Sequence, residues 1–567
     1  NNTNTMAGQT QSITLETQLE FNTVSCDKVE QVFAMGSLKA PFLEANKEKR
    51  APIDLVAVID KSGSMSGSKL QMVKKTCEFV VKHLKKDDSF SLVTYDSGVS
   101  TDIPICKMNT KNKEKVISVL RKTKAGSCTN LSGGLLAGLD QIGKSKSGNK
   151  VASVFLFTDG LANEGITSEH GIKKAAKDML KAIETACSVY TFGFGSDHNP
   201  TMLRGIAETG AGMYYFIETE DDIAESFGDA IGGLLSVIAQ NMKLTITPVG
   251  GAKITQFLGV VKAVDGEDAS DTGNDQTLST ESDEEEVVVK KPSKSKKRTN
   301  RNKQAKKSPP KNTATKPEKK PSKAIEGSTS PQSIDMGDLY SEEARDIVVG
   351  MQLPQTDTEG ECPICEFTLS YFNVITCNNE TITVVCNANR SKSPPKDQER
   401  AYDLDIQVNR LLTTKTMDNA RKFGDASKLA EARECIQEAI DTIKSSVSAS
   451  DALCQMLVDD LIDLKGDFND KRSYEVKAKK KINWKGAAHS KQRCAGKAGV
   501  SYQTKAKKAA QKSISAFNDY DDCDDDDIVM SKPTATKSKH KKRKPINSKP
   551  MAKKMPRKTK TKTMSKK

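Results

Sequence analysis

The chain has 567 residues, of which 36% are apolar and 29% are charged, and its net charge is +14. Two Lys-rich segments, 290–323 and 531–567, together carry thirty net positive charges, which leaves the rest of the chain at −16. Both segments hold too few apolar residues to form a core. The composition therefore excludes a single basic nucleic-acid-binding domain as a description of the whole chain.

The sequence also argues against a membrane span and a disulfide scaffold. No apolar run approaches the roughly 18 residues that a transmembrane helix needs. Thirteen Cys are sparse for this length, and the number is odd. We therefore expect reduced thiols and a cytoplasmic or nuclear protein, while the start at Asn1 rather than Met leaves an extracellular location open.

The N-terminal part predicts a short disordered stretch followed by strands. Residues 1–9 are small and polar, which is typical of a frayed terminus. Alternating apolar residues in Ser12–Glu20, and the apolar run Val32–Met35, indicate two strands within residues 10–50. We expect these strands to pair with a second domain further along the chain.

Residues 51–242 alternate between strand-like and helix-like patterns. Strands are predicted at 55–59, 90–95, 154–157, 189–194 and 214–217, with an edge strand at 99–106. Helical spacing of apolar residues lies between them, ending in a long amphipathic helix from Ile223 to Ile238. Because the strands are continuous apolar runs joined by helices, we predict an α/β domain with a doubly wound, mostly parallel sheet.

The remainder divides into a β region, an insert, a helical region and a tail. β patterning occupies 243–266 and 334–400, and the acidic and basic stretch 267–333 between them is predicted to be disordered. Helices are predicted at 401–422, 426–445 and 450–465 within a helical region 401–518. An acidic run and a basic tail, 519–567, end the chain, and we expect the basic tail to be disordered.

Three loops carry the chemistry. Asp60, Ser62 and Ser64 directly follow the first buried strand of the α/β domain, Asp159 follows a later strand, and Thr129 precedes a helix. Ligands of parallel sheets bind beyond the carboxyl ends of the strands, where these residues are expected. Carboxylates and hydroxyls are hard oxygen donors that suit Mg²⁺ or Mn²⁺, and the lack of His or Cys argues against Zn²⁺. Taken singly, the loops are also explained by helix capping and turn formation.

This order of motifs resembles the metal-ion-dependent adhesion site of von Willebrand factor type A domains. Asp-x-Ser-x-Ser after a strand, a distant Thr, and Thr-Asp-Gly after a later strand carry the resemblance, which spans about 51–242. It implies that the hydroxyls of Ser62, Ser64 and Thr129 bind the ion directly, whereas Asp60 and Asp159 act largely through water.

The flanks resemble intracellular type A proteins that add a β-sandwich and a C-terminal helical segment. The strand at Ser12–Glu20, the segment Asp338–Asp346, and the stretch that contains His489, Arg493 and Tyr502 carry this second resemblance. It implies that the Lys-rich insert is a loop between two sandwich strands. Plant relatives of this kind add a zinc-binding RING module and act as ubiquitin ligases.

Four cysteines form an incomplete zinc pattern: Cys362, Cys365, Cys377 and Cys386. The first two have the Cys-x-x-Cys spacing of zinc ligands, but the second pair is separated by more than the two to four residues that such sites use. A RING module would need about eight ligands. Ordinary thiols therefore explain these residues better than a zinc site.

Basic clusters lie in both Lys-rich segments: Lys296, Lys297, Arg298, Lys541, Lys542, Arg543 and Lys544. They fit nuclear-import signals, binding of nucleic acid or another polyanion, or a solvated tail. Interleaved aromatic residues, which would indicate stacking on single-stranded bases, are absent from them.

The sequence thus yields one leading functional hypothesis and two alternatives. The leading one is a divalent-metal-dependent protein-binding module whose partner supplies an acidic residue to the ion. The alternatives are a nuclear, polyanion-binding protein that acts through its Lys-rich segments and, more weakly, a ubiquitin-ligase-like scaffold. We find no nucleophile elbow, phosphate-binding loop or dinucleotide fingerprint, and therefore predict no enzyme.

Overall fold

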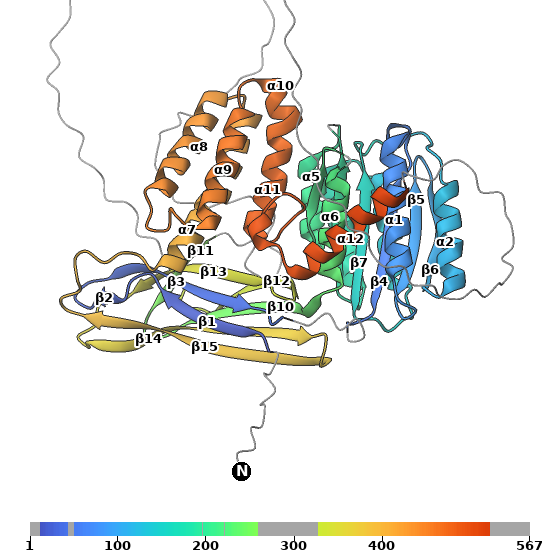
Figure 1. Cartoon of the computed structure of the whole chain (residues 1–567). Helices are drawn as coiled ribbons and strands as arrows, with labels where there is room; N and C mark the ends of the chain where they lie inside the picture. Colours follow the sequence, from blue (N-terminus) through green and yellow to red (C-terminus); the bar gives the residue numbers. More distant parts are fainter. Residues whose placement is uncertain (1–11, 43–49, 196, 220, 259–326, 522–567) are drawn as a thin grey trace, which may run out of the picture. The chain divides into compact units, whose positions relative to one another are not determined.

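The computed structural model describes residues 12–42, 50–195, 197–219, 221–258 and 327–521. Its α/β domain is built on a six-stranded sheet in the order β6-β5-β4-β7-β8-β9 (Figure 1). All neighbouring pairs are parallel except the edge pair of β5 and β6, which confirms the predicted doubly wound sheet. The strands are β4 (Ile53–Asp60), β5 (Ser89–Tyr95), β6 (Val99–Lys107), β7 (Val151–Thr158), β8 (Cys187–Phe194) and β9 (Tyr214–Ile217).

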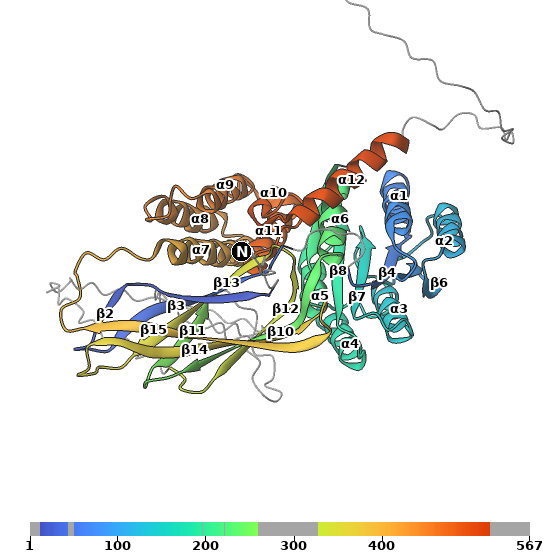
Figure 2. The same cartoon turned by 60° about the horizontal axis from the view of Figure 1, so that its bottom comes forward.

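Helices cover both faces of this sheet, with α1 and α6 on one face and α3 and α4 on the other (Figure 2). Every residue of β4 and β7 is consequently buried, which explains why these strands are continuous apolar runs. The helical elements are η1 (Gly63–Met65), α1 (Ser68–His83), α2 (Thr110–Lys122), α3 (Leu131–Gly143), α4 (Glu169–Ala182), α5 (Pro200–Thr209) and α6 (Asp221–Leu234). The predicted helix to Ile238 is too long, because the chain leaves the helix at Leu234 and pairs as a strand from Val237.

Two further sheets pack face to face around a second apolar core. One has the order β1-β3-β13-β11 and the other β12-β10-β14-β15-β2. Gly36 lies at a close approach of the two sheets, since a Cβ there would be 2.7 Å from the Phe367 ring. The strands are β1 (Thr14–Leu19), β2 (Thr23–Ser25), β3 (Glu30–Lys39), β10 (Val237–Pro248), β11 (Lys253–Leu258), β12 (Gln332–Tyr340), β13 (Ala344–Leu353), β14 (Gly360–Asn373) and β15 (Asn378–Ser391).

The C-terminal region is helical and has its own core. Its last described helix packs closely on α6, because the glycines at 228 and 232 let the α12 backbone approach. The elements are α7 (Tyr402–Asp425), α8 (Leu429–Lys444), α9 (Ala452–Gly466), α10 (Lys471–Ser473), a π-helical turn η2 (Tyr474–Ala478), α11 (Lys479–Lys491), η3 (Val500–Tyr502) and α12 (Lys505–Asp521).

Several sequence predictions fall on residues outside the described ranges. These are the disorder predicted for residues 1–9, the disorder predicted for nearly all of the insert 267–333, and the disorder predicted for the tail beyond residue 521. The predicted insert ends at residue 333, whereas β12 begins at Gln332, so the last two residues of the predicted insert belong to a strand. Within the ranges described above, no helix is both long and apolar enough to cross a membrane.

A buried histidine predicts acid sensitivity of the α/β domain. His198 is 3% exposed, its Nε2 lies 2.7 Å from the Tyr214 hydroxyl, and burial together with the charge of Lys480 lowers its pKa to about 3. The unfolded state binds a proton on this ring below about pH 6.5, whereas the folded state does not until about pH 3. The unfolding free energy should therefore fall as the pH drops from 7 to 5. Urea denaturation at both pH values should show a smaller fall for His198→Gln, and equal falls in both chains would contradict the assignment.

Candidate metal-binding site

The candidate site lies where the strand order of the α/β sheet reverses. Asp60 ends β4, and Asp159 follows β7, its neighbour in the sheet. The chain leaves β4 toward β5 on one side, whereas β7 leads to β8 on the other. Such a point leaves a crevice outside the carboxyl ends of the strands, because the two connections diverge.

Four of the five predicted residues are linked by direct contacts. The Ser62 and Ser64 hydroxyls lie 3.1 Å apart, and the Ser64 hydroxyl donates to Oδ1 of Asp159 over 2.7 Å. Oδ1 of Asp60 accepts from the Ser62 backbone N–H at 2.8 Å, and its Oδ2 accepts from the Thr158 hydroxyl at 2.6 Å. These contacts gather oxygen atoms from two loops that are about 95 residues apart in sequence.

The fifth residue, Thr129, lies beside the same loops. A Cβ added to Gly160 would be 3.4 Å from the Thr129 hydroxyl oxygen and 3.8 Å from that of Ser64. A Cβ at this glycine would therefore be in van der Waals contact with both hydroxyls, which places Thr129 and Ser64 next to the same position. The backbone N–H of Thr129 donates to Oδ1 of Asn163 at 2.8 Å, which fixes Thr129 against the loop after β7.

Backbone contacts tie the loop after β4 to the loop that precedes α3. The Gly63 N–H donates to the Ser127 carbonyl over 2.9 Å, and the Gly126 N–H donates to the Lys61 carbonyl over 2.5 Å. Gly67, with φ +84°, turns the chain into α1 in a conformation that suits glycine. Backbone hydrogen bonds and the turn at Gly67, and not side-chain packing alone, therefore fix the positions of the loops that carry Ser62, Ser64 and Thr129.

The electrostatics of the site suit a cation. Asp60, Ser62 and Asp159 are at most 1% exposed, and burial raises the pKa of Asp60 despite hydrogen bonds from Thr158 and Ser62. Oδ2 of Asp159 contacts the Lys69 ammonium, which is one-third exposed. Two carboxylates and three hydroxyls are hard oxygen donors, so the residues present fit Mg²⁺ or Mn²⁺. In the described ranges, no cluster of three or more His, Cys, Asp or Glu residues forms another candidate.

Sequence reasoning missed Lys69 and Asn163 as neighbours of the site. Lys69 lies in the first turn of α1, where a basic side chain is unfavourable because it faces the positive end of the helix dipole. This unfavourable position is the feature of the sequence that indicates an acidic neighbour. Asn163 lies in an irregular loop, and its contact with Thr129 depends on folding over 34 residues. Thr158 belongs to the Thr-Asp-Gly motif, but its hydrogen bond to Asp60 is visible only in three dimensions.

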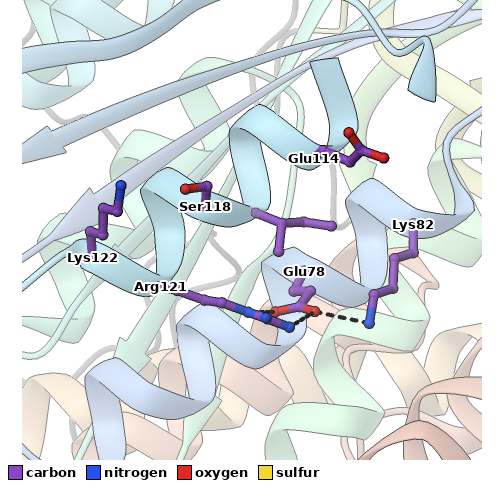
Figure 3. A pocket seen from close by; sticks show the side chains of 7 residues that line it. Glu78, Lys82, Glu114, Ser118, Arg121 and Lys122 are labelled. Atoms are coloured by element: carbon purple, nitrogen blue, oxygen red, sulfur yellow. Dashed lines mark hydrogen bonds and ion pairs between the residues drawn. The ribbon is translucent and has the colours of Figure 1, made fainter. Parts of the chain in front are cut away.

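A cleft of about 480 Å³ between α1 and α2 is a separate feature (Figure 3). Its central carboxylate, Glu78, accepts from Nε and Nη2 of Arg121 at 3.0 and 2.6 Å and pairs with Lys82 at 2.9 Å. Burial would raise the pKa of Glu78, but these cationic partners outweigh it and the pKa is lowered. The charges of Glu78, Arg121 and Lys82 therefore satisfy one another, and this central cluster does not indicate a ligand.

The structure does not assemble the four-cysteine zinc pattern. Cys365 and Cys386 stand opposite each other in β14 and β15, whereas Cys377 lies in the turn that joins these strands. Cys362 faces Ala388 instead. The turn is eight register positions from the Cys365–Cys386 pair, and at about 3.3 Å per residue this distance is too great for one ion. The basic clusters at 296–298 and 541–544 lie outside the described residues, and polyanion binding by them stays a prediction.

Comparison with known proteins identifies two segments. Residues 54–229 match the family model of the von Willebrand factor type A domain, and residues 400–495 match that of the CPSF6-like RSLD domain, N-terminal region. A solved von Willebrand factor type A protein from Catenulispora acidiphila aligns over 86% of this chain and 98% of its own, with a TM-score of 0.55 and 12% identity. That likeness extends to most of the fold.

Two curated relatives share part of the sequence. An uncharacterised protein of Synechocystis is 28% identical over 200 residues, which is 35% of this chain and 46% of that protein. The E3 ubiquitin-protein ligase WAV3 of Arabidopsis thaliana is 29% identical over 205 residues, which is 36% of this chain and 25% of the ligase. The chain thus spans less than half the length of these relatives. The parallel sheet, the order of the three loops and the family match together show that residues 54–229 form a von Willebrand factor type A domain.

Proposed function

We propose that the type A domain, at 51–242, is a divalent-metal-dependent protein-binding module of a larger non-catalytic scaffold. The observation that carries the proposal is the convergence of the Ser62, Ser64 and Asp159 oxygens at 2.7–3.1 Å, with Thr129 beside them. We further propose that the other segments form a β-sandwich-like domain, 243–266 with 334–400 and the strands of 10–50, and a helical region, 401–518.

The five side chains divide into two roles in this proposal. The hydroxyls of Ser62, Ser64 and Thr129 would hold Mg²⁺ or Mn²⁺ directly, because they are neutral oxygen donors on two loops that lie side by side. Asp60 and Asp159 would orient those hydroxyls and the surrounding water, since Asp60 already accepts a hydrogen bond from the Ser62 backbone N–H and Asp159 accepts one from the Ser64 hydroxyl. When bound, the ion supplies an electrophilic position that a Glu or Asp carboxylate of the partner completes.

Metal removal tests this function. We expect the full chain to retain acidic partner proteins from a lysate in Mg²⁺, and to release them when a chelator is added, because the partner carboxylate loses the metal ion that it binds. Readdition of Mg²⁺ should restore retention. Capture that is equally strong with chelator, confirmed by quantitative mass spectrometry of the eluates, would contradict metal-dependent binding.

A ubiquitin-ligase-like role is the weaker alternative. It is supported by the name of the WAV3 relative, whose aligned part is a quarter of that protein. The separation of Cys377 from the Cys365–Cys386 pair argues against it, because a RING module needs zinc ligands in close groups.

A further inference from the structure

Two cysteines face each other across the longest hairpin of the sandwich. Cys365 of β14 is directly opposite Cys386 of β15 in an antiparallel register. Both side chains point into the core between the two sheets, with exposed fractions of 0% and 2%. Among the strand pairings that the structure describes, no other cysteine stands opposite a cysteine.

The register satisfies the geometric requirement of a disulfide. Directly opposed residues in an antiparallel ladder have Cα atoms about 4.5–5.5 Å apart, and disulfides span about 4.4–6.8 Å between Cα atoms. A register irregularity between Pro363 and Cys365 precedes the pair, after which the ladder runs regularly to the turn. Bridging therefore needs no change in strand pairing.

The two thiols already interact. A hydrogen bond from the Cys365 thiol lowers the pKa of Cys386, and the same contact, together with burial, raises the pKa of Cys365. Because a thiolate is the attacking species in disulfide exchange, whichever of the two thiols loses its proton first is the nucleophile and the other is the resolving thiol.

We propose that Cys365 and Cys386 form an oxidisable dithiol that closes to a cross-strand disulfide with a low-molecular-weight disulfide such as oxidised glutathione. One cysteine of the pair loses its proton to solvent, its thiolate attacks one glutathione sulfur, and one reduced glutathione leaves. The other cysteine then loses its proton and attacks the cysteine sulfur of the mixed disulfide, which releases the second reduced glutathione. Two thiols are thereby oxidised and one glutathione disulfide is reduced.

The bond would tie β14 to β15 in the middle of the larger sandwich sheet. Closure restricts the unfolded chain between residues 365 and 386, so the oxidised protein should melt at a higher temperature than the reduced one. Burial of both sulfurs limits access in the closed fold, so oxidation should proceed through local opening of the hairpin. The inference is independent of the metal site.

Peptide mapping of the full chain tests the proposal. The native protein is incubated with oxidised glutathione or with dithiothreitol, at a urea concentration below its unfolding midpoint, then alkylated, digested and analysed by mass spectrometry. We expect a linked peptide pair that contains Cys365 and Cys386, two hydrogens lighter than the separate peptides, only after oxidation. The oxidised protein should also melt several degrees higher.

Variants of the same strand provide the controls. Cys362 lies on the same strand but stands opposite Ala388, so Cys362→Ser should retain the link between Cys365 and Cys386. Cys386→Ala should abolish the link and leave Cys365 alkylated. Alkylation of both Cys365 and Cys386 in the oxidised wild-type chain would overturn the proposal, as would a link from either one to another cysteine. These outcomes are read in the wild-type protein, so they do not depend on folding of a variant.

Discussion

Glu343→Gln should lower the unfolding free energy by about 3–5 kcal/mol, because it leaves two buried guanidinium groups without their counter-charge. Glu343 is 4% exposed. Its Oε1 accepts from Nε of Arg493 at 2.6 Å, and its Oε2 accepts from Nη2 of Arg345 at 3.0 Å. Burial would raise the pKa of Glu343, but Arg345 and Arg493 outweigh it and lower the pKa to about 2. The carboxylate is therefore fully charged in the folded protein at neutral pH.

The loss should be large because this carboxylate joins three parts of the fold. Arg493 follows α11, Glu343 lies in the turn between β12 and β13, and Arg493 also stacks over Tyr340 at 4.1 Å. The hydroxyl of Tyr340 contacts that of Tyr190, on β8 of the type A domain. The Ser188 hydroxyl donates to Oδ2 of Asp338 at 2.7 Å across the same junction. Removing the charge should thus loosen the junction as well as the local turn.

Thermal and urea denaturation of the full chain check this prediction against an exposed ion pair. Glu16→Gln removes a carboxylate that lies 3.7 Å from Lys39, with both side chains more than half exposed. Such pairs contribute about 0–1 kcal/mol, so this control should unfold almost as the wild type does. A Glu343→Gln protein that unfolds together with the Glu16→Gln control would show that the buried charges are not the source of stability.

The pH dependence of this contribution follows from the lowered pKa. An unfolded Glu binds a proton below about pH 4.3, whereas folded Glu343 does so only near pH 2. The stabilisation is therefore complete above about pH 5 and is lost as the pH falls toward 2. It acts at lower pH than the contribution of His198.

The sequence predicts the α/β layout because local periodicity and burial agree in that domain. Strands buried on both faces are mostly apolar, and helices that cover a sheet show one apolar side, so β4, α1 and β5 are readable from residues alone. The positions of Asp60 and Asp159 follow from the same logic, because both lie at strand ends on either side of the reversal in strand order.

The buried charge cluster could not be predicted in this way. The contacts of Arg493 with Glu343 join residues 150 positions apart, and an Arg or Glu in a polar stretch is ordinarily exposed. Similarly, the pairing of β3 with β13 joins an N-terminal strand to one more than 300 residues later, and no local pattern specifies that partner. Long-range pairing and charge burial depend on the complete fold rather than on any window of sequence.

Asp159→Ala should weaken Mg²⁺ binding by about 10–100-fold, the usual effect of losing a carboxylate that orients metal ligands. Its Oδ1 accepts from the Ser64 hydroxyl, so the substitution frees that hydroxyl to rotate away from Ser62. Lys69→Met should have the opposite effect and strengthen binding by up to about tenfold, because it removes a positive charge that contacts the same carboxylate. Isothermal titration of each full-length variant with Mg²⁺ measures both changes.

The opposite signs of these two effects separate electrostatics from structural damage. A substitution that merely disturbs the loop after β7 would weaken binding at either position, whereas charge control predicts weaker binding for Asp159→Ala and tighter binding for Lys69→Met. Asp178→Ala, on the exposed side of α4, changes the net charge as Asp159→Ala does and should leave the affinity unaltered. If Asp159→Ala binds Mg²⁺ as the wild type does, the ion is held elsewhere and the three loops lose their proposed role. If only Lys69→Met departs from expectation, the loops keep that role and the ammonium instead serves to fix the Asp159 carboxylate in place.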